Sequence, residues 1–207
     1  MNMEPSWLTL GRRLAALAQC GLAYSRDQFD IERYHELQRI AADIMSSGSE
    51  DDPETILGLF RNERGYATPK LDVRGVVVHD DRVLLVRERS DGGWTLPGGW
   101  IDVGDSPSEA ASREVFEESG YVVKPFRLLA LYDRSRHPHP PLPPHIYKVF
   151  IQCELLGGAP ATSIETDGVG FFEEHNLPEL SVTRVTLSQI KRMFQLHGDP
   201  LAPADFD

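Results

Sequence analysis

The chain has 207 residues, of which 41% are hydrophobic and 26% are charged, a balance typical of folded globular proteins and too apolar for general disorder. Its 32 acidic and 21 basic side chains give a formal net charge of −11, which argues against sequence-independent binding to a nucleic-acid backbone, because such binding needs a basic surface. The length suits one domain of ordinary size, or one domain with a small appendage. No apolar run approaches the ~18 residues that span a bilayer, so we expect no membrane partner.

The first part of the chain is predicted to be helical. Apolar residues recur with helical period in three segments, at residues 7–23, 31–44 and 53–60. Asp27 and Asp30 are both placed to cap the second of these helices, and Asp52 is placed to cap the third. Because strand patterns begin only after them, we expect residues 1–65 to form a small all-helical domain and residues 66–207 to form the main domain.

The main domain mixes strands with two helices. β-branched and apolar residues predict strands at 73–78, 83–86, 94–96, 122–132, 146–155 and 168–172. A helix is expected over residues 106–119, because Ser106-Pro107 is a start signal and Gly120 is a stop signal. The last helix is expected over residues 183–197, where apolar residues again recur at helical spacing.

The cysteines and the N-terminal residues indicate the cellular compartment. Cys20 and Cys153 lie far apart and form no C-x-x-C pair, so the sequence suggests neither a disulfide framework nor a zinc site. Arg12 and Arg13 interrupt the apolar residues near the N-terminus, which lacks the pattern of a signal peptide. We therefore expect a cytoplasmic protein.

Nearly half of the net charge falls in one short segment, since residues 99–121 hold six acidic side chains and one basic side chain. In the expected helix, Glu114, Glu117 and Glu118 stand at positions i, i+3 and i+4, where they share one face and repel one another. A solvated acidic face is the ordinary interpretation of such a run. The alternative is a bound hard cation, because Mg²⁺ and Mn²⁺ prefer carboxylate oxygens, and the glycine-rich turn before the helix favours this alternative.

Residues 99–121 resemble the Nudix box, whose pattern is G-x5-E-x7-R-E-U-x-E-E-x-G-U with U apolar. The segment reads Gly99-x5-Asp105-x7-Arg113-Glu114-Val115-x-Glu117-Glu118-x-Gly120-Tyr121. It departs from the pattern at Asp105, in place of glutamate, and at Tyr121, in place of an aliphatic residue. In the family the first carboxylate braces the box arginine, and the resemblance implies that Asp105 braces Arg113 across a slightly longer gap.

The resemblance extends beyond the box to one Nudix subgroup, through the helical N-terminus and the runs at 68–74, 90–104 and 163–172. It implies an α+β fold, an α/β/α sandwich around a mixed sheet, preceded by a small helical domain through which two subunits form a homodimer. It also implies that residues 66–207 form the catalytic domain and hydrolyse the pyrophosphate bond of a nucleoside diphosphate linked to another moiety. CDP-choline and ADP-ribose are the two substrates that the resemblance leaves open, and the products would be a nucleoside monophosphate and a phosphorylated partner.

The same resemblance implies roles for the box residues. The expected ligands of Mg²⁺ or Mn²⁺ are the carbonyl of Gly98 and the carboxylates of Glu114, Glu117 and Glu118. Arg113 is expected to brace the loop. The general base is either the box residue Glu117 or the later loop residue Glu165, and an ordinary exposed acid is the alternative interpretation of Glu165.

Substrate phosphates need cationic partners, and Arg74 and Arg87 lie on strands just before the box, in a segment without net charge. Trp100 is an aromatic side chain on which a base or choline could stack. Solvated arginines and core packing are the ordinary alternatives for these residues. A different function, a nucleotide-sensing regulator without catalysis, is disfavoured by the intact box glutamates, and no DNA partner is expected. Hydrolysis of an RNA end stays open, because an active site can bind a terminus locally.

Overall fold

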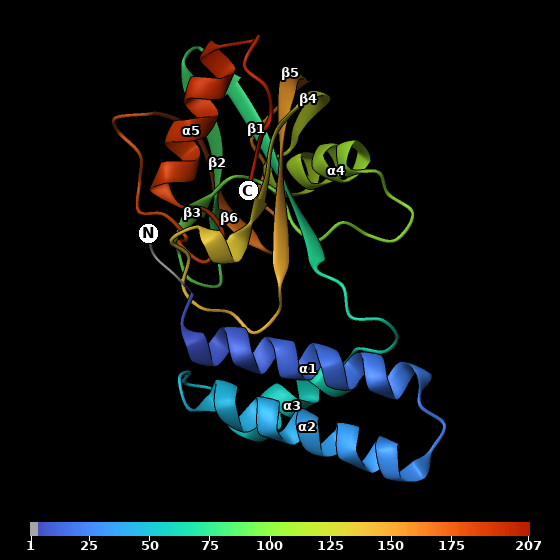
Figure 1. Cartoon of the computed structure of the whole chain (residues 1–207). Helices are drawn as coiled ribbons and strands as arrows, with labels where there is room; N and C mark the ends of the chain where they lie inside the picture. Colours follow the sequence, from blue (N-terminus) through green and yellow to red (C-terminus); the bar gives the residue numbers. More distant parts are fainter. Residues whose placement is uncertain (1–3) are drawn as a thin grey trace. The chain divides into compact units, whose positions relative to one another are not determined.

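The computed structural model describes residues 4–207 and divides the chain into two compact units (Figure 1). One unit, the helical unit, is built by the chain up to Pro69 together with Pro141–His145. The other, the sheet unit, is built by Lys70–Pro140 and Ile146–Asp207. The helical unit thus includes a late segment that a division into residues 1–65 and 66–207 assigns to the main domain.

The helical unit consists of α1 (Ser6–Tyr24), α2 (Gln28–Ser46) and α3 (Pro53–Asn62). Side-chain caps begin the last two helices, since Asp27 accepts from the backbone N–H groups of Phe29 and Asp30, and Asp52 accepts from that of Thr55. The core of the unit contains Leu8, Ala42, Met45, Ile56 and Leu57. Among residues 4–207, no helix combines the length and the apolar character that crossing a bilayer requires.

The late segment Pro141–His145 joins the helical unit through α1. Arg12 donates from Nε to the carbonyl of Pro143 at 2.8 Å and from a second nitrogen to the carbonyl of Leu142. Arg12 also forms an ion pair with Glu4. These bonds hold part of the proline-rich stretch against a helix that lies about 130 residues earlier in the chain.

The sheet unit is built on one sheet, which contains seven strands within the described residues. These are β1 (Lys70–His79), β2 (Arg82–Glu88), β3 (Trp94–Thr95), β4 (Tyr121–Asp133), β5 (Ile146–Gly158), β6 (Thr166–Glu173) and β7 (Asp205–Phe206). The order is β3-β2-β1-β5-β4-β7, and β6 pairs with β2. The pairs β1–β5 and β4–β7 are parallel and the others are antiparallel, so the sheet is mixed.

Two helices cover this sheet, α4 (Pro107–Ser119) and α5 (Leu187–Gly198) (Figure 1). Alternate residues of β1 point to opposite faces. Val73 and Val77 belong to a core cluster with Val115 of α4, whereas Val76 belongs to a second cluster with residues of α5. The predicted α/β/α sandwich around a mixed sheet, preceded by a helical region, is therefore confirmed.

The prediction for the last helix was wrong at its start. The helix begins at Leu187 rather than at Thr183, because Thr186 and Gln189 form a capping box in which each side chain bonds the other's backbone N–H. The residues before it form a turn, with the backbone N–H groups of Arg184 and Val185 donating to Ser181 O. Apolar periodicity cannot distinguish such a turn from the first helical turn.

Candidate active site

The glycine-rich turn before the box is attached to the first half of β1. Backbone bonds join Val73 N to Gly99 O at 2.8 Å and Gly75 N to Pro97 O at 2.8 Å, and a third joins Ile101 N to Leu71 O at 3.1 Å. β1 and β2 pair only near their hairpin, so the turn occupies the edge of β1 beyond that point. The turn is therefore hydrogen-bonded to β1 in the way that a neighbouring strand would be.

Gly98 is the residue at which this close approach forbids a side chain. Its φ of +147° is one that L side chains rarely adopt. A Cβ atom at this position would lie 2.0 Å from the carbonyl oxygen of Val73. Only glycine therefore fits at position 98, the position whose carbonyl the resemblance assigns as a metal ligand.

The box helix α4 is defined at both ends by its own sequence. Ser106 and Glu109 form a capping box, Pro107 occupies the first turn, and Gly120 ends the helix in the left-handed conformation at φ 75°. The buried face of the helix packs on the sheet through Ala110, Ala111 and Val115. The carboxylates predicted at i, i+3 and i+4 therefore emerge from one rigid helix beside the glycine turn.

Glu118 is the most deeply buried of these carboxylates. Its residue is 5% exposed, and Oε2 accepts a hydrogen bond from Gly98 N at 2.9 Å. Burial raises the pKa of Glu118 to about 8, against the opposing effects of the Arg74 charge and the Gly98 bond. Burial also raises the pKa of Glu114, although Arg113 opposes this rise. At both carboxylates, the effect of burial on the pKa therefore outweighs the effect of the nearby positive charges.

Arg113 connects the acidic residues of the box. Its Nη1 donates to Glu114 at 2.8 Å and to Glu117 at 3.2 Å, and its Nε donates to Asp105 at 3.3 Å. Asp102 lies 3.6 Å from its Nη2. Asp105, the shorter residue in the glutamate position of the box, thus reaches the arginine. The geometry agrees with a bracing role for Arg113.

The donors around α4 fit a hard divalent cation. A Cβ on Gly99 would lie 3.2 Å from both carboxylate oxygens of Glu114. The glycine turn therefore lies close to Glu114 at Gly99 and is bonded to Glu118 at Gly98. All donors are oxygens, and their net charge is negative. Within the described residues, no group of three acidic, histidine or cysteine side chains is arranged to hold a metal ion. Glu114 is bonded to Arg113, and Glu118 is bonded to Gly98 N. The metal ligands inferred from the box stay a prediction.

The predicted substrate contacts have different environments. Arg74 is 4% exposed, and its Nε and Nη2 donate to Asp72 at 2.8 and 3.0 Å. Arg87 lies near the surface and pairs with Asp167 at 2.6 Å. Trp100 is half-exposed on the glycine turn. The structure thus places Arg74 beside the box acids but beneath the surface, whereas Arg87 and Trp100 are open to solvent.

Glu165 lies on the exposed loop before β6 and beside the end of α4. The next residue, Thr166, donates from its hydroxyl to the carbonyl of Glu118 at 2.8 Å, and Ser163 accepts from the backbone N–H of Glu165 at 3.0 Å. This side-chain turn holds the loop near the box. The structure thus brings the loop that carries Glu165 to the end of the box helix, and a catalytic role for Glu165 stays a prediction.

Four charged residues of this region were missed by the sequence analysis: Asp72, Lys148, Glu88 and Arg184. Glu88 ends β2, is buried, and pairs with Arg184 at 2.7 Å. Its pKa is raised by burial, against the effects of Arg184 and Arg74. A usable signal did exist, because charged residues that alternate with apolar ones on a buried strand must share a face, as Asp72 and Arg74 do. The pairing with Lys148 depends on strand order, which one sequence does not reveal.

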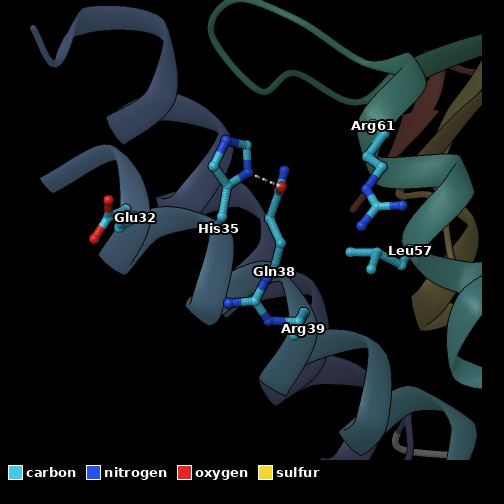
Figure 2. A pocket seen from close by; sticks show the side chains of 6 residues that line it. All are labelled: Glu32, His35, Gln38, Arg39, Leu57 and Arg61. Carbon is cyan, nitrogen blue, oxygen red and sulfur yellow. Dashed lines mark hydrogen bonds between the residues drawn. The ribbon is translucent and has the colours of Figure 1, made fainter. Parts of the chain in front are cut away.

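A pocket of about 550 Å³ lies elsewhere, in the helical unit between α2 and α3. Figure 2 shows His35, Gln38 and Arg39 on α2 facing Leu57 and Arg61 on α3. Arg39 pairs with Glu36 at 2.5 Å, and Glu32 is the one acidic residue that lines the pocket. None of the box residues lines this pocket, so it is separate from the candidate site at α4.

Two family models match the chain. Residues 5–60 match the UDP-X-like, N-terminal oligomerisation domain. Residues 69–193 match the NUDIX domain, which is more than half of the chain. The gap between the two matches, residues 61–68, begins at the end of α3 and stops just before β1.

Similar proteins have been named and solved. A protein of Bacillus subtilis (strain 168), YjhB, provisionally named an ADP-ribose pyrophosphatase, is 45% identical over 207 residues, which is the full length of both chains. A crystal structure titled UDP-X diphosphatase is 32% identical, with a TM-score of 0.64 over 99% of this chain and 100% of that one. An ADP-ribose pyrophosphatase from Streptococcus suis 89-1591 is 38% identical, with a TM-score of 0.63 over 68% of this chain and 100% of that one.

Proposed function

Because the chain belongs to the Nudix family of pyrophosphohydrolases, we propose that it hydrolyses the pyrophosphate bond of a nucleoside diphosphate linked to another moiety, with Mg²⁺ as cofactor. The observation that carries the proposal is the acidic face of α4 against the Gly98 turn, with Glu118 bonded to Gly98 N. ADP-ribose is the first substrate to test, because the relative that matches the full length is named for it. CDP-choline and UDP-linked sugars follow.

The chain's residues divide the work as follows. Arg113 orients Glu114 and Glu117, and β1 fixes the glycine turn opposite them. A bound divalent cation would neutralise charge on the pyrophosphate oxygens and lower the pKa of the attacking water. Glu117 or Glu165 would accept the proton of that water. Trp100 and Arg87, both exposed, are available to the base and the phosphates.

The substrate test incubates the purified protein with Mg²⁺ and, separately, with ADP-ribose, CDP-choline and a UDP-sugar in ¹⁸O-labelled water. Mass spectrometry of the products identifies the substrate and the phosphorus that receives the label. We expect a nucleoside monophosphate and a phosphorylated partner from at least one conjugate. Binding without hydrolysis of any conjugate would support a nucleotide-sensing regulator instead.

Replacing Glu165 with glutamine distinguishes the two candidate bases. If Glu165 accepts the proton, the variant loses roughly 10²- to 10⁴-fold in kcat, the usual contribution of a general base, while its affinity for Mn²⁺ is unchanged. Glu117→Gln, which removes an expected metal ligand, should by contrast weaken Mn²⁺ binding, and Glu174→Gln, an exposed acid in the same unit, serves as the control. An unchanged kcat in Glu165→Gln removes Glu165 from the mechanism.

We further propose that the protein forms a homodimer through the helical unit. The matched family model is named for oligomerisation, and α1 exposes an apolar stripe at Leu10, Leu17 and Tyr24, which are spaced by seven residues. Leu17→Glu should shift the species seen in size-exclusion chromatography with light scattering from dimer to monomer. Leu201→Glu, a matched change at an exposed leucine in the sheet unit, should not. A wild-type monomer at all concentrations would refute the dimer.

A further inference from the structure

Three charged side chains form a cluster in the interior of the sheet unit, where the proposed mechanism gives them no contact with substrate. Lys148 is 1% exposed, and its Nζ donates to Asp72 at 2.6 Å. Arg74 donates two further bonds to the same carboxylate. Asp72 therefore accepts three charge-assisted hydrogen bonds, from two cations on neighbouring strands.

The strand register brings the cluster together. Asp72 of β1 is the direct partner of Lys148 on the parallel strand β5. Arg74 follows Asp72 by two residues and so projects from the same face of β1. The pKa of Asp72, which burial alone would raise, is lowered by Arg74 and Lys148. Asp72 is therefore ionised. Burial lowers the pKa of Lys148 to about 8, against the attraction of Asp72, so the lysine carries its charge below that pH.

Arg74 connects this cluster to the glycine turn of the box. Its Nη1 donates to the carbonyl of Leu96 at 3.1 Å, two residues before Gly98. The backbone of β1 bonds the turn at Pro97 and at Gly99. The side chain of Arg74 therefore adds a further hydrogen bond to the backbone bonds that join the turn to β1.

The cluster also has a charge that matters to the box. Two cations around one carboxylate leave a single net positive charge in a region of low exposure. Arg74 carries this charge next to Glu118 and Glu88, both of which favour its charged form. Without Lys148, Asp72 and Arg74 together would carry no net charge, and the net attraction of the cluster for Glu118 would be weaker.

We propose that Lys148 and Asp72 are positioning residues of the hydrolytic site, acting through Arg74 to hold the Leu96–Gly99 turn against the acidic face of α4. The proposal rests on the proposed function for its catalytic consequence. It moves Arg74 from substrate contact to support of the turn that presents Gly98. It also assigns a role to Lys148, which is too deeply buried to touch a nucleotide.

Stability alone is a poor explanation for the cluster. Buried ionic groups often contribute little net stability, because the cost of removing them from water offsets their attraction. In Lys148→Met, Asp72 keeps both bonds from Arg74, so no carboxylate is left without a partner. A merely structural lysine should therefore be replaceable by methionine with little effect on catalysis. A positioning lysine should not.

The test compares Lys148→Met with wild type in three measurements. We expect kcat to fall roughly 10- to 100-fold, the usual loss when the support of a metal site is removed, with KM nearly unchanged. The affinity for Mn²⁺ alone, measured by titration calorimetry, should fall as well. Amide hydrogen exchange should become faster in the peptide that contains residues 96–99. The melting temperature should stay near that of wild type.

Arg127→Met is the matched control, since Arg127 is an arginine of the same unit that donates to the carbonyls of Leu196, Asp199 and Ala202. It should lower the melting temperature without changing kcat, Mn²⁺ affinity or exchange at residues 96–99. If Lys148→Met does not fold, Arg74→Lys is used instead, because it keeps the charge but lacks the planar guanidinium group that bonds Asp72 through two nitrogens and Leu96 through a third.

Unchanged kcat and Mn²⁺ affinity in the folded variant would overturn the positioning role. If the wild-type protein hydrolyses none of the conjugates, the proposed function fails, but Mn²⁺ affinity and amide exchange still test the cluster. Faster exchange at residues 96–99 together with weaker Mn²⁺ binding would then support the positioning of the turn without the catalytic claim.

Discussion

Glu118→Gln should nearly abolish hydrolysis and at the same time make the metal-free protein more stable at pH 8. The activity falls because the variant loses a carboxylate that we propose as a metal ligand, and a loss of at least roughly 100-fold is expected, since even residues that only support metal ligands cost 10- to 100-fold. The stability rises because the wild-type carboxyl group is buried, with a pKa raised from 4.5 to about 8. Glutamine has a similar shape, keeps an oxygen for the Gly98 N–H, and carries no charge.

The sign of the pH dependence follows from the raised pKa. Below pH 4.5 Glu118 is protonated in both the folded and the unfolded chain and does not oppose folding. Between that value and about 8, folding requires it to take up a proton, which lowers the free energy of unfolding by roughly 1.4 kcal/mol for each pH unit. The advantage of Glu118→Gln should therefore be absent near pH 4 and largest at pH 8 and above.

Urea unfolding of the metal-free proteins at pH 4.5, 6 and 8 measures this difference directly. Adding Mn²⁺ should stabilise wild type and leave Glu118→Gln much less affected, because a ligand stabilises only the state that binds it. Glu154→Gln, an exposed acid on β5, makes the same change in net charge and should show neither effect. If metal-free Glu118→Gln is less stable than wild type at pH 8, Glu118 is ionised in the folded protein and its bond to Gly98 outweighs its burial.

The local elements could be predicted because their signals lie within a few residues. Asp52 and the pair Ser106-Pro107 each begin a helix where expected, and Gly120 ends one. Of the two caps that the sequence offered for the second helix, Asp27 is the one used, and Asp30 lies in the first turn. The last helix was misplaced because the capping pair Thr186 and Gln189 competes with an apolar pattern that continues across the preceding turn. The assignment of Pro141–His145 to the helical unit was not predictable, since it depends on carbonyls bonded by a distant arginine.

Some features of the candidate site could likewise be predicted from the sequence, and others could not. The acidic face of α4 follows from the spacing of three glutamates on one helix, and the contact between Arg113 and Asp105 follows from the box resemblance. The environment of Arg74 does not follow from the sequence. A strand arginine before an acidic helix suggested an exposed phosphate ligand, but its carboxylate partner is two residues away and its second cation arrives from β5. Only the parallel pairing of β1 and β5 brings Lys148 to Asp72.

Gly98→Ala should unfold or strongly destabilise the sheet unit, for two separable reasons. Alanine rarely adopts the φ of +147° found at this position, and its Cβ would lie 2.0 Å from Val73 O, which is backbone and cannot move without breaking the attachment of the turn to β1. Strain and overpacking each cost about 1–3 kcal/mol, so a loss of roughly 2–6 kcal/mol is expected. Thermal and urea unfolding of the purified variant measure it.

Two further glycine variants separate backbone strain from steric contact and keep the test informative if Gly98→Ala does not fold. Gly104 has a φ of +107° but open space where a Cβ would stand, so Gly104→Ala should show only the cost of strain. Gly99→Ala should fold, because its Cβ would meet the flexible end of Glu114 at 3.2 Å, but it should push that carboxylate and weaken Mn²⁺ binding and kcat. Equal unfolding free energies for Gly98→Ala and Gly104→Ala would show that the turn can leave β1 without cost. In that case the backbone bonds at Val73 and Gly75 would not be what holds the Gly98 carbonyl in place. Both the proposed metal ligands and the proposed role of Lys148 require a rigidly held turn, so both proposals would then lose their structural basis.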